Sequence, residues 1–136
     1  MKTLLIVCIL AAYALPVGGT QNDVIKRVVF SKGKTTVTYA GKMPKVYEGY
    51  DSYVFRAKKG QTLDVALTAA DPAAIVAIYE TKVLDPEQNT ILGNSEKRRE
   101  WAAKLPVTGE YEIQVYTTED SQESAPRTYS IQITLR

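Results

Sequence analysis

Apolar and polar residues alternate along most of the chain after its first twenty residues, which is the pattern of half-buried β-strands. In residues 111–116 and 128–135 every second side chain is apolar. Residues 73–80 form an almost continuous apolar run, as expected for a strand that is buried on both faces. Turn motifs such as Lys-Lys-Gly at 58–60 separate these segments. The pattern therefore predicts a chain of short strands.

About seven such segments, with turn residues between them, predict an all-β fold: a single small antiparallel β-sandwich of about seven to eight strands. Residues 94–105 would also suit a capped helix with a solvated charged face, but we interpret 100–105 as a strand. No linker, repeat or low-complexity tract divides residues 20–136, which we expect to be one domain. The other expected strands lie within residues 24–30, 34–41, 49–57, 62–68, 73–80, 110–116 and 128–135.

Residues 1–19 have the composition of a secretory signal peptide. Lys2 supplies a positive charge, an apolar run follows, and small residues allow cleavage after Ala14 or Gly19. The run is too short for a transmembrane helix. We prefer the later cut, which predicts an exported chain that begins at Thr20 and does not insert into a membrane after processing.

Composition argues against several classes of function. The only cysteine, Cys8, lies in the leader, and the chain has no histidine. These absences remove the commonest general base, the commonest metal ligand and every Ser-His or Cys-His arrangement. The formal net charge is only +2, so no polybasic surface for nucleic acid is predicted. We expect a protein that is not an enzyme and has no catalytic residues, metal or cofactor.

Three segments carry a resemblance to a known family: VVFSKGKTTVTYAGK…GYDSYVFRAKKGQTLDVAL, LPVTGEYEIQVY and YSIQITL. In this order they resemble the periplasmic inhibitors of g-type and i-type lysozymes and, more distantly, the pre-peptidase C-terminal β-sandwich domains. The resemblance covers nearly all of residues 20–136, and GYDSYVFRAKKGQTLDV is its most specific part. Thr108-Gly109-Glu110-Tyr111 is similar to the family's Ser-Gly-x-Tyr motif, with threonine in place of serine.

The resemblance implies a periplasmic β-sandwich that inhibits a lysozyme by inserting edge loops into its substrate cleft. It implies that Thr108 offers a hydroxyl to the cleft, that Gly109 provides a tight turn, and that Tyr111 steadies or extends this loop. Tyr50 matches a tyrosine of the neighbouring loop that contacts the enzyme in g-type inhibitors. The expected partner is a lysozyme or a related peptidoglycan hydrolase.

Both tyrosines have a second interpretation from the residues alone. Tyr111 shares a face with the apolar residues of its strand, so it is also expected at the mouth of the core. Tyr50 stands between Gly49 and Asp51, interpreted as turn residues, and is either a surface contact or a lid over the sandwich edge. Trp101 is expected in the core.

The segment before the last strand departs from the family pattern. Glu119, Asp120 and Glu123 stand where the family carries arginines, and Arg127 is the only basic residue nearby. Acidic groups would be repelled by the catalytic carboxylates of a lysozyme cleft but attracted to a cationic rim. This departure leaves the type of lysozyme open.

Two other functions fit the same fold. The first is a pre-peptidase-type module that binds envelope polysaccharide or protein through a sheet face carrying Tyr39, Tyr53 and Phe55. The second is an immunity protein against a cell-wall hydrolase. Exposed tyrosines that gather at one edge would favour a plug, and a row along a flat face would favour carbohydrate binding. A monomer and a homodimer are both compatible, because an exposed edge strand can pair two copies.

Overall fold

The computed structural model describes five stretches of the chain. The predicted leader and the acidic segment around Glu119 and Glu123 lie outside them. No helix in the described part is long and apolar enough to cross a membrane. The described stretches are residues 25–45, 49–81, 90–94 (backbone only), 99–118 and 127–136.

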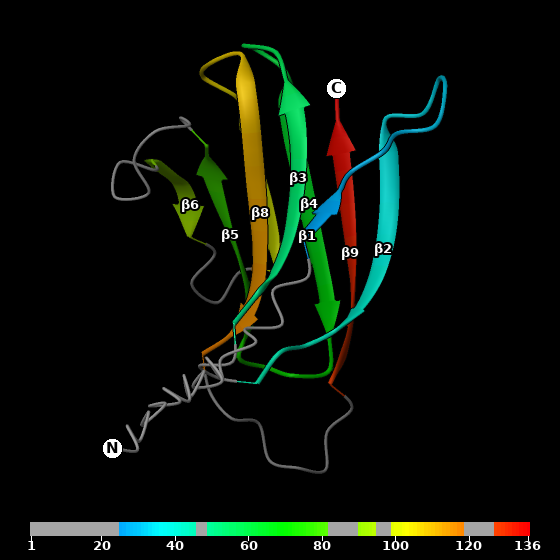
Figure 1. Ribbon diagram of the computed structural model, residues 1–136, viewed down its shortest axis with the longest axis vertical. Helices are drawn as coiled ribbons and strands as arrows, with labels where there is room; N and C mark the ends of the chain where they lie inside the picture. Colours follow the sequence, from blue (N-terminus) through cyan, green and yellow to red (C-terminus); the bar gives the residue numbers. More distant parts are fainter. Residues whose placement is uncertain (1–24, 46–48, 82–89, 95–98, 119–126) are drawn as a thin grey trace, which may run out of the picture.

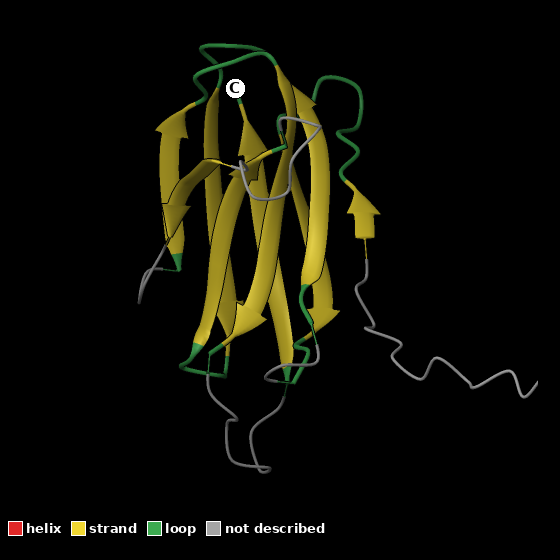
Figure 2. Ribbon diagram, turned by 60° about the vertical axis from the view of Figure 1, so that its left-hand side comes forward, coloured by secondary structure: helices red, strands yellow, loops and turns green. Residues whose placement is uncertain are grey.

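Nine β-strands and no helix make up the regular structure of the described residues. They form two sheets packed face to face (Figures 1 and 2), which confirms the predicted all-β sandwich. The strands are β1 (Ile25–Arg27), β2 (Thr36–Lys42), β3 (Asp51–Ala57), β4 (Thr62–Ala69), β5 (Ala74–Glu80), β6 (Thr90–Asn94), β7 (Glu100–Lys104), β8 (Gly109–Thr117) and β9 (Thr128–Leu135).

One sheet has five strands in the order β1-β3-β8-β5-β6, and the other has four in the order β2-β9-β4-β7. All strand pairs are antiparallel except β1 with β3, which is parallel. The count exceeds the prediction because of β6. This strand was not predicted, since the sequence Thr-Ile-Leu-Gly-Asn shows no clear alternation.

The core lies between the inner faces of the sheets, where alternation places the apolar residues. Tyr53, Ile113 and Ile78 face one another across three neighbouring strands and are fully buried. Phe30 and Val37 pack at the margin of this core. Val76 and its neighbours make β5 a buried strand, as predicted from its apolar run.

The strand prediction for residues 100–105 is confirmed by β7. Trp101 lies opposite Val65, so it faces inward, but at this edge it is only partly buried against the core. Arg99, just before β7, donates hydrogen bonds to the carbonyl oxygens of Ala69 and Asp71. It therefore fastens β7 to the connection between β4 and β5.

The antiparallel pairing of β3 with β8 fixes where the predicted site residues lie. Asp51 pairs with Val115 at one end of the sandwich, and Ala57 pairs with Gly109 at the other. We call these the Tyr50 end and the Thr108 end. The two strands run in opposite directions in Figure 1, so their first residues lie at opposite ends of the molecule.

Candidate functional site

Tyr50 lies directly before β3, between Gly49, which has a positive φ, and Asp51, which begins the strand. Gly49 has a φ of 119°, a conformation that side chains rarely adopt, so the predicted turn glycine is confirmed. Asp51 was interpreted as a turn residue, and this was wrong: it is a strand residue, 4% exposed, whose carboxylate accepts a hydrogen bond from the Tyr129 hydroxyl. The backbone at Tyr50 is therefore anchored, while its side chain is half-buried.

The anchor of Asp51 belongs to a buried network of phenols. The hydroxyls of Tyr53 and Tyr129 lie 2.7 Å apart, and Tyr129 donates onward to Asp51. Burial raises the pKa of Tyr53, and burial together with the hydrogen bond to Asp51 raises that of Tyr129. Both phenols therefore stay protonated and hold the start of β3 against β9.

Two further tyrosines lie on the outer face of the five-stranded sheet: Tyr116 at the Tyr50 end, opposite Ile75, and Tyr79 further along β5, opposite Glu112. Burial raises the pKa of Tyr79, and the nearby groups of Tyr116, Glu112 and Tyr50 raise it further. Tyr79 and Tyr116 are half-buried, like Tyr50. We call these three residues the tyrosine cluster.

The tyrosine cluster surrounds an apolar floor. Ile75 lies opposite Tyr116, and Ala77 is the next outward residue of β5. They are only 8% and 2% exposed although they face away from the core between the sheets. Partly exposed aromatic rings over buried apolar residues offer a large contact area with little conformational entropy to lose.

A fixed carboxylate lies beside this cluster. Glu112 accepts hydrogen bonds from the Ser52 hydroxyl and from Nε2 of Gln114, the latter at 3.2 Å. At the same end of the sandwich, the Arg127 guanidinium donates to the carbonyl oxygen of Pro44 at 3.4 Å. The Tyr50 end thus combines aromatic rings with polar groups of both signs.

The predicted Thr108 loop is held firmly by contacts within the protein. The Thr108 hydroxyl oxygen accepts a hydrogen bond from the backbone N–H of Lys59 at 2.9 Å. The Tyr111 hydroxyl donates to the carbonyl oxygen of Val107 at 2.6 Å and accepts from the N–H of that residue at 3.3 Å. Thr108 itself is exposed, so the loop forms a rigid corner at the surface.

Tyr111 is fully buried and stacks on Phe55, with ring centroids 5.8 Å apart. The structure thus supports its expected role of steadying the loop and removes it as a surface contact. Gly109 is the first residue of β8, its φ is not positive, and a Cβ there would meet no atom within 4 Å. The positive φ at this end belongs to Gly60 in the adjacent turn.

The four predicted site residues do not meet. Thr108, Gly109 and Tyr111 lie together at the Thr108 end, whereas Tyr50 lies at the other end of the seven-residue strand β3. At about 3.4 Å per residue this separation is about 20 Å, so the expectation of neighbouring loops was wrong. Sequence reasoning missed Tyr79 and Tyr116, although Tyr116 stands on the otherwise polar face of its alternating strand.

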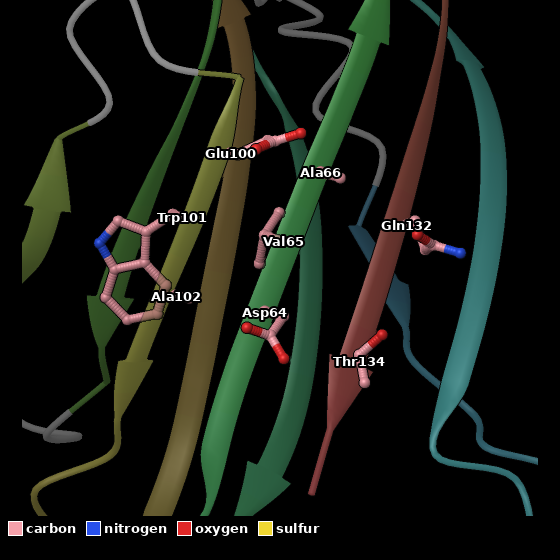
Figure 3. Close-up of a pocket in the computed structure, with 8 residues that line it drawn as sticks. All are labelled: Asp64, Val65, Ala66, Glu100, Trp101, Ala102, Gln132 and Thr134. Carbon is pink, nitrogen blue, oxygen red and sulfur yellow. The ribbon is translucent and has the colours of Figure 1, made fainter.

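The aromatic sheet face expected for a carbohydrate-binding module is not at the surface. Tyr53 and Phe55 are buried, and Tyr39 packs against the core with its ring centroid 5.3 Å from that of Tyr53. A shallow hollow of about 320 Å³ does lie on the outer face of the four-stranded sheet (Figure 3). Most of its lining residues, from β4, β7 and β9, are small or polar, but Val65 and the Trp101 ring also line it. Asp64 there is paired with Arg136.

Comparisons with known proteins agree on one group of relatives. No family model matches the sequence. The sequence is 26% identical to the inhibitor of g-type lysozyme from Escherichia coli K12 over 136 residues, covering 99% of this chain and 95% of that protein. The structure is similar to the periplasmic inhibitor of g-type lysozyme from Salmonella Typhimurium (TM-score 0.61, 26% identity, 83% of this chain and 98% of that chain).

More distant structures share the fold alone. The pre-peptidase C-terminal domain of Bacillus anthracis collagenase superposes with a TM-score of 0.55 at 10% identity, over 84% of this chain and 96% of that domain. Both resemblances inferred from the sequence are therefore confirmed, and the nearer of the two is to the inhibitors of g-type lysozyme.

Proposed function

We propose that this chain is an exported, periplasmic protein that inhibits a g-type lysozyme without catalysing a reaction. One observation carries the proposal: the similarity to the Escherichia coli inhibitor of g-type lysozyme extends over 99% of this chain and 95% of that protein. A similarity of this extent includes both ends of the sandwich and the segments between the strands. The solved relative from Salmonella Typhimurium is named as a periplasmic inhibitor of the same type of lysozyme.

We further propose that the Tyr50 end enters the lysozyme cleft. The resemblance assigns an enzyme contact to Tyr50 in g-type inhibitors. Tyr116 lies at the same end of the sandwich, and Tyr79, further along the same face, is close enough for Tyr50 to affect its pKa. Tyrosines are enriched among the residues that dominate binding energy at interfaces. Asp51 anchors the backbone beneath Tyr50, which reduces the entropy that binding would cost.

The Tyr50 end carries charges of both signs. Glycoside hydrolases cleave their substrates with a pair of carboxyl groups in the cleft, so a cationic rim on an inhibitor is attracted to it. Lys42 is exposed at the end of β2, and Arg127 lies just before β9, which pairs with it. Glu119, Asp120 and Glu123 precede Arg127 closely in the sequence, and the charges of Lys42 and Arg127 offset theirs in part.

The Thr108 corner is the alternative contact, and its lysozyme-binding role remains a prediction. Its hydroxyl already accepts a bond from Lys59, and Tyr111 is inside the protein. A single cleft would not reach both Tyr50 and Thr108, because the two lie at opposite ends of the sandwich.

The proposed function is tested by the turnover of g-type, i-type and c-type lysozymes on peptidoglycan with the purified mature protein added. We expect the g-type enzyme to be inhibited when inhibitor and enzyme are close to equimolar, and the c-type enzyme to keep its activity. Unchanged turnover of the g-type enzyme in the presence of an excess of folded protein would refute the proposal.

A further inference from the structure

Strand β2 is an edge strand of the four-stranded sheet and the outermost strand on its side of the sandwich (Figure 1). Its pairing with β9 uses the backbone groups of alternate residues. At one end of the strand the Leu135 N–H donates to the Thr35 carbonyl at 2.8 Å, and at the other end the Met43 N–H donates to the Arg127 carbonyl. The backbone N–H and C=O groups of the odd-numbered residues from 35 to 43 therefore point towards β9. The backbone groups of Thr36, Thr38, Ala40 and Lys42 therefore point away from the sheet.

Within β2 itself little protects this edge against pairing, although Lys34 and Pro44 flank the strand. Natural edge strands carry charges, prolines or bulges that prevent the addition of another strand. Over its seven residues β2 has one charge, Lys42 at its end, and its register with β9 is regular throughout. The opposite edge of the same sheet is β7, which carries Glu100 and Lys104 at its two ends.

An exposed apolar side chain lies beside this edge. Val29 is 68% exposed, and its backbone N–H donates to the Tyr39 hydroxyl at 3.0 Å. The connection from β1 to β2 is thereby held at the level of Tyr39, in the middle of the strand. Val29 is one of only two large hydrophobic residues that are strongly exposed in the described part of the chain.

We propose that two copies of this chain pair antiparallel through β2, about a two-fold axis at Tyr39. In this register Thr38 lies opposite Ala40 of the second copy, and Thr36 lies opposite Lys42. The outward backbone groups of both strands then face each other, and no two lysines are directly opposed. The two four-stranded sheets become one continuous sheet.

A second copy fits this edge better than an unrelated segment does. The register about Tyr39 places Thr38 opposite the small residue Ala40 on the outer face and sets the two Tyr39 residues opposite each other on the inner face. The exposed Val29 of each copy, whose N–H is bonded to the Tyr39 hydroxyl, is held beside this part of the edge. The formal net charge of the chain is only +2, so two copies repel each other weakly. Tyr50 lies directly before β3, a strand of the other sheet, so pairing leaves Tyr50 open, whereas Lys42 becomes part of the paired edge.

Sedimentation velocity of the purified mature protein, over loading concentrations from about 1 µM to 1 mM, tests this proposal. We expect wild type to shift from monomer to dimer. Thr38→Pro removes an outward N–H and no hydrogen bond to β9, so we expect a folded protein whose dimerisation is weakened at least about a hundredfold. Val29→Asp, on an exposed side chain, should weaken it as well.

Ala102→Pro is the matched control, because it removes the corresponding outward N–H from the opposite edge, β7. It should dimerise like wild type, with circular dichroism confirming the fold of each variant. A wild type that stays monomeric at every concentration would overturn the proposal, as would a folded Thr38→Pro protein that still dimerises. Should Thr38→Pro not fold, an unchanged dimer of Val29→Asp would overturn it.

Discussion

The hydroxyls of Tyr53 and Tyr129 meet inside the sandwich, and Tyr129 donates to the buried carboxylate of Asp51. The position of the Tyr129 ring depends on Gly41 on the neighbouring strand. A Cβ on Gly41 would lie 2.4 Å from the Tyr129 ring, closer than real Cβ atoms approach. The Tyr129 ring can therefore occupy its place in the hydrogen-bond network only because residue 41 has no side chain.

This network predicts a loss of stability in alkaline solution. Tyrosine ionises near pH 10 in the unfolded chain, and burial raises the pKa of Tyr53 and Tyr129 in the folded protein. Their contribution to stability is therefore complete below about pH 10 and is lost as the pH rises above it. Urea unfolding at about pH 8 and pH 11 should show a smaller drop for Tyr129→Phe than for wild type; equal drops would contradict the assignment.

Substitution by alanine is expected to have different effects on stability at Gly41 and at Gly109, because their surroundings differ. Gly41→Ala should destabilise the protein by about 1–3 kcal/mol, because the new methyl group collides with Tyr129. Gly109→Ala should leave the free energy of unfolding within about 1 kcal/mol of wild type, since a Cβ there meets no atom within 4 Å. Denaturant unfolding of both variants checks this pair, and a larger loss at Gly109 would mean that its backbone is strained.

At the scale of strands, alternation of apolar residues was sufficient to predict the sandwich, because the side-chain period of a strand appears directly in the sequence. It missed β6, whose five residues include glycine and asparagine. It also could not tell which strand ends lie together. The separation of Tyr50 from Thr108 follows from the pairing of β3 with β8, a contact between distant parts of the chain.

The same limit explains the assignment of Tyr111. Alternation allowed both a core position and a loop contact, and the complete burial of the ring, together with the hydrogen bonds of its hydroxyl to Val107, shows the core position. The tyrosine cluster was equally hidden, because Tyr79 and Tyr116 come from two strands whose register with each other is set by the fold.

The core predicted from the pattern can be tested by removing buried methyl groups. Val65→Ala and Ile113→Ala should each cost about 2–4 kcal/mol of unfolding free energy, because both side chains are almost completely buried. Gln132→Ala, on the exposed face of β9, is the control and should change it by less than about 0.5 kcal/mol. Losses below about 0.5 kcal/mol at both core positions would show that the strand register is wrong.

At the scale of the whole molecule, the sandwich separates two possible contact surfaces. The Thr108 end is a rigid corner whose polar groups are bonded within the protein. The Tyr50 end carries Tyr50 and Tyr116 over an anchored backbone, and the tyrosine cluster extends from there along the outer face to Tyr79.

The inhibition constant against a g-type lysozyme, measured for wild type, Tyr50→Ala and Thr108→Ala, tests the central claim most directly. We expect Tyr50→Ala to weaken inhibition by about thirtyfold or more, as loss of an aromatic interface residue does, while its melting temperature stays close to that of wild type. Thr108→Ala should inhibit like wild type. Full inhibition by Tyr50→Ala together with a loss at Thr108→Ala would place the contact at the opposite end, and no inhibition by the wild type would contradict the proposed function itself.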